Sequence, residues 1–448
     1  MTRGSTIYAP LAIPPSPEQA PQPFEPPELL ALPEDELERT PVPVAALIGM
    51  FAASVLMFGE DERLYRIPYY MGIACGLVAA IMYLRMSLPI PTAVFLYAGW
   101  CLWSSVSCLL SEFREVSFAS LGTAYQLLAL VFVLATICQD SRAMWIISGW
   151  MMMGSLANVA ASAAAGWEGL GGRSEGLLFN PNSTALAYGI AIVIQWIALA
   201  ATRSMVLRIF IVGLLLATNY ALVRTGSRSG FLCGLAAQTY VFWHYRQTIL
   251  RRPALLVAVA VCGLAAAAWL PGWLAGTVLG ERFKRTQETL TGSLGKREGS
   301  SYERITIKWV AIRETTKHPI FGLGMGNFWP TGIKTGAWRD TTHDNYCTIL
   351  VETGVPGFLL FFSIYLWTWR HSSRMRRSEW ITGSERHLVA MIRTFIILLI
   401  TTDVFNDTTW RHKTVWTFMA LSVGLLTGLE RRVQHRTALA RAAAGAPA

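Results

Sequence analysis

The sequence predicts an all-α membrane protein with about twelve transmembrane helices. Of the 448 residues, 53% are hydrophobic and only 15% are charged, and the mean hydropathy is positive. This composition is typical of a polytopic membrane protein and argues against a soluble globular enzyme. The apolar residues also recur in stretches of about 20 residues, the length that a helix needs to cross the hydrocarbon core of a bilayer.

The predicted spans cover most of the chain. They lie near residues 43–58, 69–86, 90–110, 117–138, 143–165, 183–202, 205–223, 229–246, 253–272, 346–369, 388–404 and 414–430. Nine spans therefore precede a long polar segment, residues 273–345, and three follow it within residues 346–436.

The two ends of the chain differ from the spans in composition. Residues 1–42 hold ten of the 21 prolines and few basic residues, and lack the basic and apolar regions of a signal peptide. Such a segment buries too little apolar surface to offset its ordering entropy, so we expect a disordered tail. The Ala-rich residues 437–448 are predicted to form a second loose tail.

The distribution of Lys and Arg in short loops predicts the orientation. Residues 202–208, 245–253, 370–380 and 430–436 are basic and fall on one side of the predicted membrane, together with both termini. That side is therefore predicted to be cytoplasmic, and residues 273–345 to lie outside.

The outer segment is itself basic, with 11 Lys and Arg against 7 Asp and Glu, a net charge of +4. Loops longer than about 60 residues are exempt from the orientation rule. The charge is consistent with an anionic ligand, and equally with a solvated surface of mixed charge. Within the segment Tyr302, Ile305, Trp309 and Ile312 recur at helical spacing, which predicts an amphipathic helix that ends before Pro319 and lies on the membrane-embedded body.

The seven histidines separate by predicted side. Four lie at cytoplasmic helix ends: His244, His371, His387 and His435. Of the outward three, His318 ends a helix before Pro319, and His412 in WRHK resembles an interfacial anchor. This leaves His343, in THDN at the start of the tenth span. A lone histidine is more often structural than catalytic, so a catalytic role for His343 depends on the residues around it.

Three even-numbered spans begin at the outer face with polar and basic residues. These are Arg173, Asn182 and Ser183 before the sixth span, Arg224, Ser227 and Arg228 in RTGSRSG before the eighth, and Thr342 before the tenth, with Asn182, Ser183, Ser227 and Thr342 as candidate caps. Helix N-termini and arginines both suit phosphate oxygens. If the three starts converge, they form a diphosphate site beside a base; otherwise the arginines hold lipid headgroups.

Three further features have structural interpretations. Glu352 lies nine residues after His343, about two and a half helical turns, so it faces away and is predicted to pack against another element. Gly354 and Gly357 are predicted to allow close helix contact. The GxGxG of PIFGLGMGNF (319–328) lacks the strand–helix context of a dinucleotide site and predicts a turn-rich crossing.

The seven cysteines show neither disulfide-framework nor metal-ligand spacing.

Taken together, these residues resemble the O-antigen ligase and polymerase superfamily of bacterial envelope glycosyltransferases. The resemblance spans the twelve-helix layout and is sharpest in WVAIRETTKHPIFGLGMGNF and HDNYCTILVETGVPG. The ligase motif is a His, then Asn, Ser or Gln, nine intervening residues, a Gly, two residues, and then Gly, Thr or Tyr; His343, Gly354 and Gly357 fit it. Asp344 departs from it, standing where an amide or hydroxyl residue is usual.

The resemblance implies an O-antigen ligase in the bacterial inner membrane, with both termini cytoplasmic and a periplasmic active site. The donor would be a polysaccharide on undecaprenyl diphosphate and the acceptor lipid A–core oligosaccharide, completing lipopolysaccharide. His343 would be the general base. Arg173 and Arg228, and less directly Arg224, would bind the diphosphate. Asp344 and Asn345 are candidates to orient the imidazole. No metal, cofactor or nucleic acid is expected, and membrane lipids are expected partners.

Related activities use the same chemistry. An O-antigen polymerase would extend a second lipid-linked glycan, and a protein O-oligosaccharyltransferase would modify protein hydroxyls, so only the acceptor separates the three. A transporter for an anionic lipid would instead place charged residues near the bilayer midplane and show repeated halves.

Overall fold

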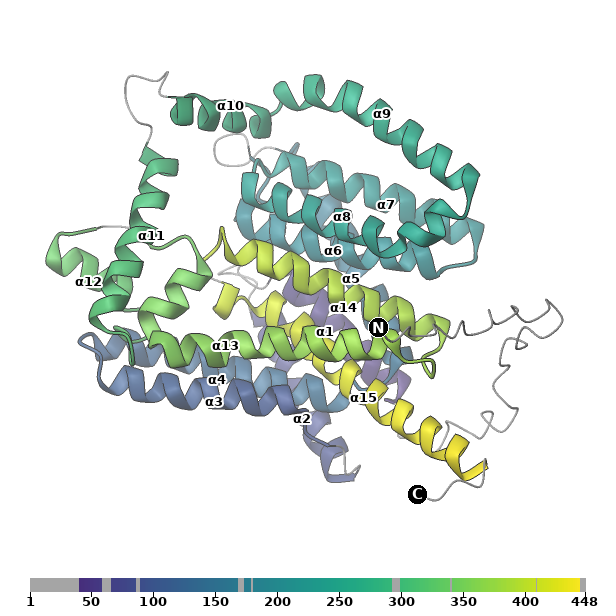
Figure 1. The fold of residues 1–448 in the computed structure, drawn as a ribbon, viewed down its shortest axis with the longest axis horizontal. Helices are drawn as coiled ribbons and strands as arrows, with labels where there is room; N and C mark the ends of the chain where they lie inside the picture. Colours follow the sequence, from purple (N-terminus) through teal and green to yellow (C-terminus); the bar gives the residue numbers. More distant parts are fainter. Residues whose placement is uncertain are drawn as a thin grey trace, which may run out of the picture.

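The structure, a computed structural model, describes residues 40–58, 66–85, 89–167, 173–178, 180–291, 299–338, 341–407 and 409–443. Within these ranges the chain forms fifteen α-helices and two short 3₁₀ helices, and no strand (Figure 1). The α-helices are α1 (Val42–Phe58), α2 (Arg66–Arg85), α3 (Thr92–Leu109), α4 (Arg114–Ile137), α5 (Ser141–Ala164), α6 (Pro181–Ala201), α7 (Met205–Arg224), α8 (Arg228–Leu250), α9 (Pro253–Ala275), α10 (Val278–Thr291), α11 (Gly299–Lys317), α12 (Phe328–Thr335), α13 (Asn345–Arg377), α14 (Gly383–Asp403) and α15 (Lys413–Ala443). The 3₁₀ helices are η5 (Gly176–Leu178) and η6 (Thr409–Arg411).

Each of the twelve predicted spans overlaps a helix. Six helices, α3 to α7 and α13, are long and apolar enough to cross a membrane among the described residues. The shorter α1 and the first part of α2 are apolar as well. The chain is therefore an all-helical, multi-pass membrane protein, and twelve crossings stay a prediction.

The centre of the bundle consists of α6, α14 and α15. Every residue of α6 from Ser183 to Gln195 is buried, as are nearly all residues of α14 from Leu388 to Leu399. The surrounding helices enclose them, with α8 packed on α6 and α14, and α4 packed on α15. Because protein rather than lipid surrounds these helices, they tolerate polar side chains that a lipid-facing helix would not.

The polar segment between α9 and α13 gathers at one end of the bundle. In Figure 1, α9 runs along the top of the molecule, and α10, α11 and α12 follow toward its left end. Helix α11 packs against α13. We call this end, which carries α10 to α12, the outer end, and the opposite one the inner end.

Helix α11 confirms the predicted helix before Pro319, but it buries a different face. Ile305, Trp309 and Ile312 are all exposed, and the side chain of Tyr302 lies outside the described residues. The buried face is formed instead by Ile307 and Ala311, which pack near Phe328, Trp338 and Val351. The small Ala311 admits a close neighbour, which the hydrophobic periodicity alone did not reveal.

Helix α13 breaks at Gly354, which has φ 70° and ψ −178°. Tyr346 lies before the break and Phe362 after it, yet their ring centroids are 4.7 Å apart. A continuous helix would separate these residues by about 24 Å. The chain therefore folds back at Gly354, and the prediction of one span beginning at residue 346 is wrong: residues 345–353 form a short helix beside the long limb.

The turn-rich segment 319–328 fits against this break. Leu323 N–H donates to the carbonyl of Val351 and Gly324 N–H to that of Glu352, both at 2.9 Å. A Cβ on Gly354 would collide with the backbone carbonyl of Ile320. The close contact predicted for Gly354 is thus made with a loop. A Cβ on Gly357 would meet Thr353 and Trp103 of α3, so the helix contact predicted there is confirmed.

Of the predicted tails, residues 1–39 and 444–448 lie outside the described residues. The prediction of a loose tail from residue 437 is wrong for residues 437–443, because they belong to α15. At the C-terminal end, α15 continues to Ala443, beyond residue 436 where the membrane domain was expected to end.

Candidate active site

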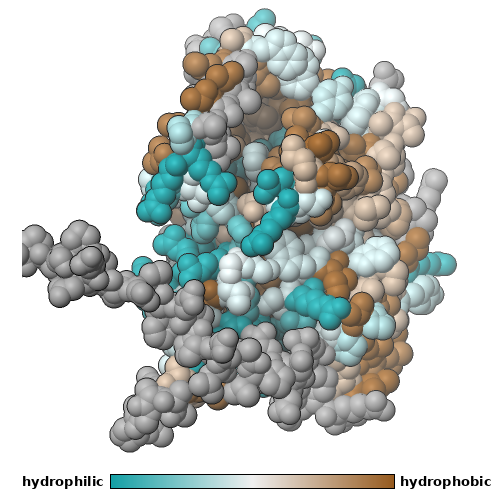
Figure 2. All heavy atoms as spheres, turned by 90° about the vertical axis from the view of Figure 1, so that its right-hand side faces the viewer, coloured by the Kyte–Doolittle hydropathy of each residue, from teal (hydrophilic) through white to brown (hydrophobic). Residues whose placement is uncertain are grey.

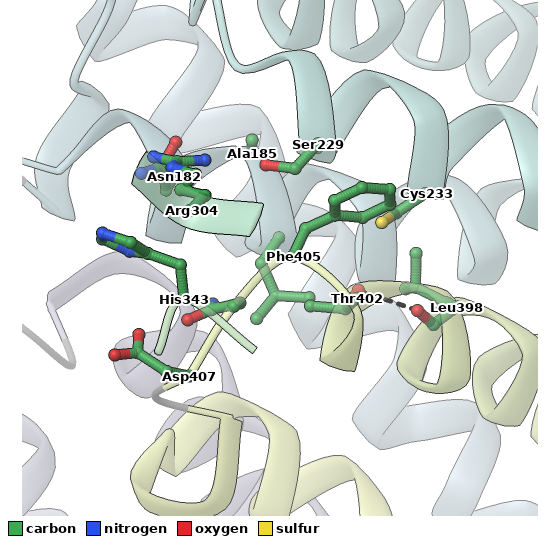
Figure 3. Close-up of a pocket in the computed structure, with 13 residues that line it drawn as sticks. Asn182, Ala185, Ser229, Cys233, Arg304, His343, Leu398, Thr402, Phe405 and Asp407 are labelled. Atoms are coloured by element: carbon green, nitrogen blue, oxygen red, sulfur yellow. Dashed lines mark hydrogen bonds between the residues drawn. The ribbon is translucent and has the colours of Figure 1, made fainter. Parts of the chain in front are cut away.

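A cavity of about 100 Å³ lies where the first turns of α6 and α8 meet α11, His343 and the chain after α14 (Figure 3). Asn182 and Ser229 come from the two helix starts, Arg304 comes from α11, and Asp407 follows α14. In Figure 3 the polar ends of His343, Arg304, Asn182 and Asp407 lie on one side of the view. Small-molecule pockets typically measure about 300–1,000 Å³, so this one admits only part of a large ligand.

His343 sits in a strained turn at the edge of this cavity. Its φ is 51°, in the left-handed region that residues other than glycine rarely adopt, and its side chain is half-buried. Such strain costs about 1–3 kcal/mol and is concentrated at functional sites. The turn places the imidazole just before the short helix 345–353.

Asp344 is the N-cap of that helix, with a carboxylate that accepts from Cys347 N–H at 3.0 Å. It also forms an ion pair with Lys308 of α11 at 2.7 Å. The cap predicted at Thr342 is therefore at Asp344; the Thr342 hydroxyl bonds Thr348 and the carbonyl of Asp344 instead. Asn345 is fully buried beside Asp403.

The caps at the other two helix starts are also defined. Ser227 caps α8, as predicted, by accepting from Gly230 N–H at 3.2 Å. For α6 the cap is Asn180, not Asn182 or Ser183, because its side chain accepts from the N–H groups of those two residues. Pro181 then occupies the first helical position, where its missing N–H is tolerated.

Three arginines, Arg228, Arg282 and Arg304, lie within electrostatic range of Arg173. The pKa of Arg173 is lowered to about 10, first by burial. The like charges of Arg282, Arg228 and Arg304 lower it further, while Glu175 acts in the opposite direction. The pKa of Arg282 is lowered as well, by burial and then by neighbouring arginines. Mutual repulsion of this kind favours an anionic ligand.

Backbone carbonyls hold these guanidinium groups in place. Arg173 Nε donates to the carbonyl of Thr225 and Arg282 Nη1 to that of Gly226, both at 2.9 Å. Arg228 donates to the carbonyl of Arg282 at 3.3 Å and to the hydroxyl of Thr286. Helix α10 is thereby tied to the start of α8.

Asn182 connects the arginines to the cavity. It lines the cavity, and its Oδ1 accepts from Arg173 Nη2 at 3.4 Å and from the Ser227 hydroxyl at 3.0 Å. The structure therefore brings the α6 start, the α8 start and His343 to one cavity, with Arg304 in its lining. The predicted Arg173, Arg224 and Arg228 are not among the residues that line it.

Arg224 is placed differently from the other predicted arginines. It ends α7, and its carbonyl accepts from Ser174 N–H at 2.9 Å. Its Nε is buried without a hydrogen-bond partner among the described residues. Arg224 is also not among the charges that act on Arg173.

The predictions missed Arg282, Arg304 and Asp407. The net charge of the outer segment was the one signal for the two arginines, but it did not single them out from the other basic residues there. Asp407 had no signal, because its position depends on how the chain leaves α14.

Two other residues have structural positions. Glu352 is buried and its carboxylate accepts from Phe328 N–H at 3.4 Å, which agrees with the predicted packing role. His412 is only 3% exposed, with Nε2 3.3 Å from the Ser183 hydroxyl. The interpretation of His412 as an interfacial anchor is therefore wrong, because η6 folds inward over the start of α6. Among the described residues, no group of three His, Cys, Asp or Glu side chains is arranged to hold a metal.

The fold and the cavity define a multi-pass membrane protein with a cationic, histidine-bearing site at its outer end. Residues 211–362 match the family model described as O-antigen ligase, which confirms the resemblance to that superfamily. A search of curated proteins found no match to this chain. The family implies a glycosyltransferase of the ligase or polymerase type that acts on lipid-linked glycans. The matched range contains Arg228, Arg282, Arg304 and His343, whereas Arg173 precedes it.

Proposed function

We propose that this protein is an O-antigen ligase, which transfers a polysaccharide from undecaprenyl diphosphate to lipid A–core oligosaccharide at the periplasmic face of the bacterial inner membrane. The observation that carries the proposal is the cavity that His343 and Arg304 line together with Asn182, which in turn accepts a hydrogen bond from Arg173. Acid–base chemistry and diphosphate binding are the two functions that this transfer requires.

The arginines bind the diphosphate of the donor. Arg173, Arg228 and Arg282 present guanidinium groups from three separate elements, and the free N–H groups at the start of α8 add positive potential. As the glycosidic bond to the diphosphate breaks, negative charge grows on the leaving oxygen. Fixed cations stabilise that charge without reorganising, which is usually the largest contribution to catalysis.

His343 is the general base. An acceptor sugar hydroxyl attacks the anomeric carbon opposite the diphosphate, its proton passes to the imidazole, and the configuration inverts. A positioned base contributes about 10²–10⁴-fold to such a step. Asp344 fixes the turn that carries His343 through its cap and its ion pair with Lys308.

The limited volume of the cavity indicates that only part of each substrate lies inside it. About 100 Å³ accommodates the reacting groups, so the glycan and the acceptor extend outside it. Polymerase and protein O-oligosaccharyltransferase activities would use the same His343 and arginines with different acceptors.

The test is reconstituted transfer with undecaprenyl diphosphate-linked glycan, with lipid A–core present or absent. Wild-type protein is expected to place glycan on lipid A–core, and His343→Ala to lose at least about 10²-fold in rate. The matched control is His318→Ala, which removes an exposed histidine from the same outer segment and should retain activity. Longer lipid-linked chains formed without core would replace the ligase assignment by a polymerase.

A further inference from the structure

A second cluster of basic side chains lies in the inner half of the bundle, between α8, α13 and α14. Its centre is Arg393 of α14, only 6% exposed. Arg393 Nε donates to the Tyr240 hydroxyl at 2.8 Å, and its Nη1 bonds the Ser373 hydroxyl. The guanidinium also stacks on Trp369, with Cζ 3.9 Å from the ring centroid. A buried arginine held in this way is a fixed positive charge.

Other basic side chains lie near Arg393 and the adjacent His244 of α8. Arg376, Arg393, His387 and Arg246 all act electrostatically on His244 of α8. His244 Nδ1 is buried without a hydrogen-bond partner among the described residues. The cluster thus combines two helix-borne arginines, Arg246 and Arg376, with the fixed charge of Arg393 behind them.

No carboxylate of the described residues forms an ion pair with Arg246, Arg376 or Arg393. The nearby carboxylates are engaged elsewhere: Glu385 pairs with Arg432 and Arg436, and Glu430 with Arg374 and His371. Partly buried charge without a counterion is unfavourable, so the cluster favours a bound anion.

The cluster borders an apolar outer surface. Trp243 is 63% exposed on α8, and the guanidinium of Arg246 lies 4.2 Å from its ring centroid. Phe242 and Leu235 are also exposed on this helix. An exposed tryptophan beside an arginine is typical of a membrane–water interface. Figure 2, which views the molecule from the inner end, shows hydrophilic residues across the middle of the face and hydrophobic ones toward its upper and right edges.

We propose that this cluster binds the phosphate of an anionic phospholipid, whose acyl chains lie along the exposed face of α8. Arg246 and Arg376 contact the phosphate, and Arg393 supplies positive potential from behind. Basic pockets between transmembrane helices are suited to anionic headgroups, and this end is the predicted cytoplasmic one. The site is distinct from the donor site, because Arg228 and Arg246 are about 27 Å apart along α8.

The test measures lipid binding to delipidated, detergent-solubilised full-length protein by native mass spectrometry and thermal shift. The ligands are phosphatidylglycerol, phosphatidylcholine and inorganic phosphate. We expect phosphatidylglycerol to bind in preference to phosphatidylcholine. The double variant Arg246→Gln/Arg376→Gln should bind it about 25-fold more weakly, at about fivefold per arginine. The matched control, Arg203→Gln/Arg208→Gln, removes two exposed arginines at the connection of α6 to α7 and the first turn of α7, on the same predicted side, and should bind as wild type.

Three results would overturn the proposal. Equal affinity for the two lipids would remove the headgroup preference. Equal weakening in the two double variants would mean that overall charge, not this cluster, attracts the lipid. Stabilisation by inorganic phosphate as strong as that by phosphatidylglycerol would exclude the lipid as the source of the anion. Melting temperatures of both variants without lipid show that the proteins are folded.

Discussion

Arg173 and Arg282 are held by backbone carbonyls at positions where neighbouring guanidinium groups repel them. Below the lowered pKa of about 10, Arg173 is charged and this repulsion is fully present. An anion that binds between the groups removes it, so it stabilises the folded state by mass action.

We therefore expect pyrophosphate to raise the melting temperature of the wild type. Arg282→Gln should bind pyrophosphate about tenfold or more weakly, because one charge-assisted hydrogen bond contributes about 1.5–3 kcal/mol. Arg313→Gln, which removes an exposed arginine from the same outer segment, is the control. An equal response of the two variants would argue against a defined diphosphate site.

Asp344 can either hold the turn before residues 345–353 or orient the imidazole. Its contacts with Cys347 N–H and Lys308 favour the first role. Asp344→Ala should then lower the free energy of unfolding by about 1–2 kcal/mol, the usual contribution of a helix cap. Asp344→Asn keeps an acceptor and should lose less. Thermal denaturation checks both, and a shifted pH profile of transfer in Asp344→Asn would instead support the orienting role.

At the scale of elements, the positions of the helices were well predicted because apolar length determines them. The break in α13 was not predicted, although Gly354 and Pro356 interrupt the apolar run there. The fold-back itself depends on contacts with a loop about 30 residues earlier, which the sequence does not show. The sequence does indicate the α6 cap, because Asn180 directly precedes Pro181 and Pro is favoured at the first helical position. The face of α11 was misassigned because exposed Trp309 and Ile305 have the same periodicity as core residues.

The break in α13 makes Gly354 sensitive to substitution. Its φ and ψ fall in a region that is essentially restricted to glycine, and a Cβ would collide with Ile320. Gly354→Ala should lower the free energy of unfolding by more than about 3 kcal/mol, or prevent folding. Gly213→Ala in α7, where a Cβ meets open space, should be neutral or slightly stabilising. Comparable melting temperatures for the two variants would contradict the fold-back.

At the scale of the whole molecule, a buried carboxylate links two helices at the inner end. Glu385 accepts from Thr382 N–H at 2.9 Å and pairs with Arg432 at 3.0 Å and Arg436 at 3.1 Å, joining α14 to α15. Burial alone would raise its pKa, but the Thr382 hydrogen bond and the two arginines outweigh burial and hold the pKa below its ordinary value.

This lowered pKa predicts how stability depends on pH. The contribution of Glu385 is complete above the unfolded-state pKa of about 4.3 and is lost as pH falls through the lower folded-state value. Glu385→Gln should be less stable at pH 7, by about 3–5 kcal/mol, and should lose less on acidification. Glu430→Gln, which breaks a more exposed pair, should cost at most about 1 kcal/mol. The comparison uses melting temperatures measured from pH 7 to pH 3. An equal dependence of the melting temperature on pH in wild type and Glu385→Gln would contradict the prediction.

In the proposed function, the outer end combines two roles in one place, with the arginines binding the donor and His343 activating the acceptor. The most direct test measures donor binding and glycan transfer on the same purified proteins: wild type, His343→Ala and Arg282→Gln. We expect His343→Ala to bind the lipid diphosphate donor with wild-type affinity but to transfer glycan at least about 10²-fold more slowly. Arg282→Gln should bind the donor about tenfold or more weakly. Transfer by His343→Ala at the wild-type rate would show that this cavity is not the site of the reaction.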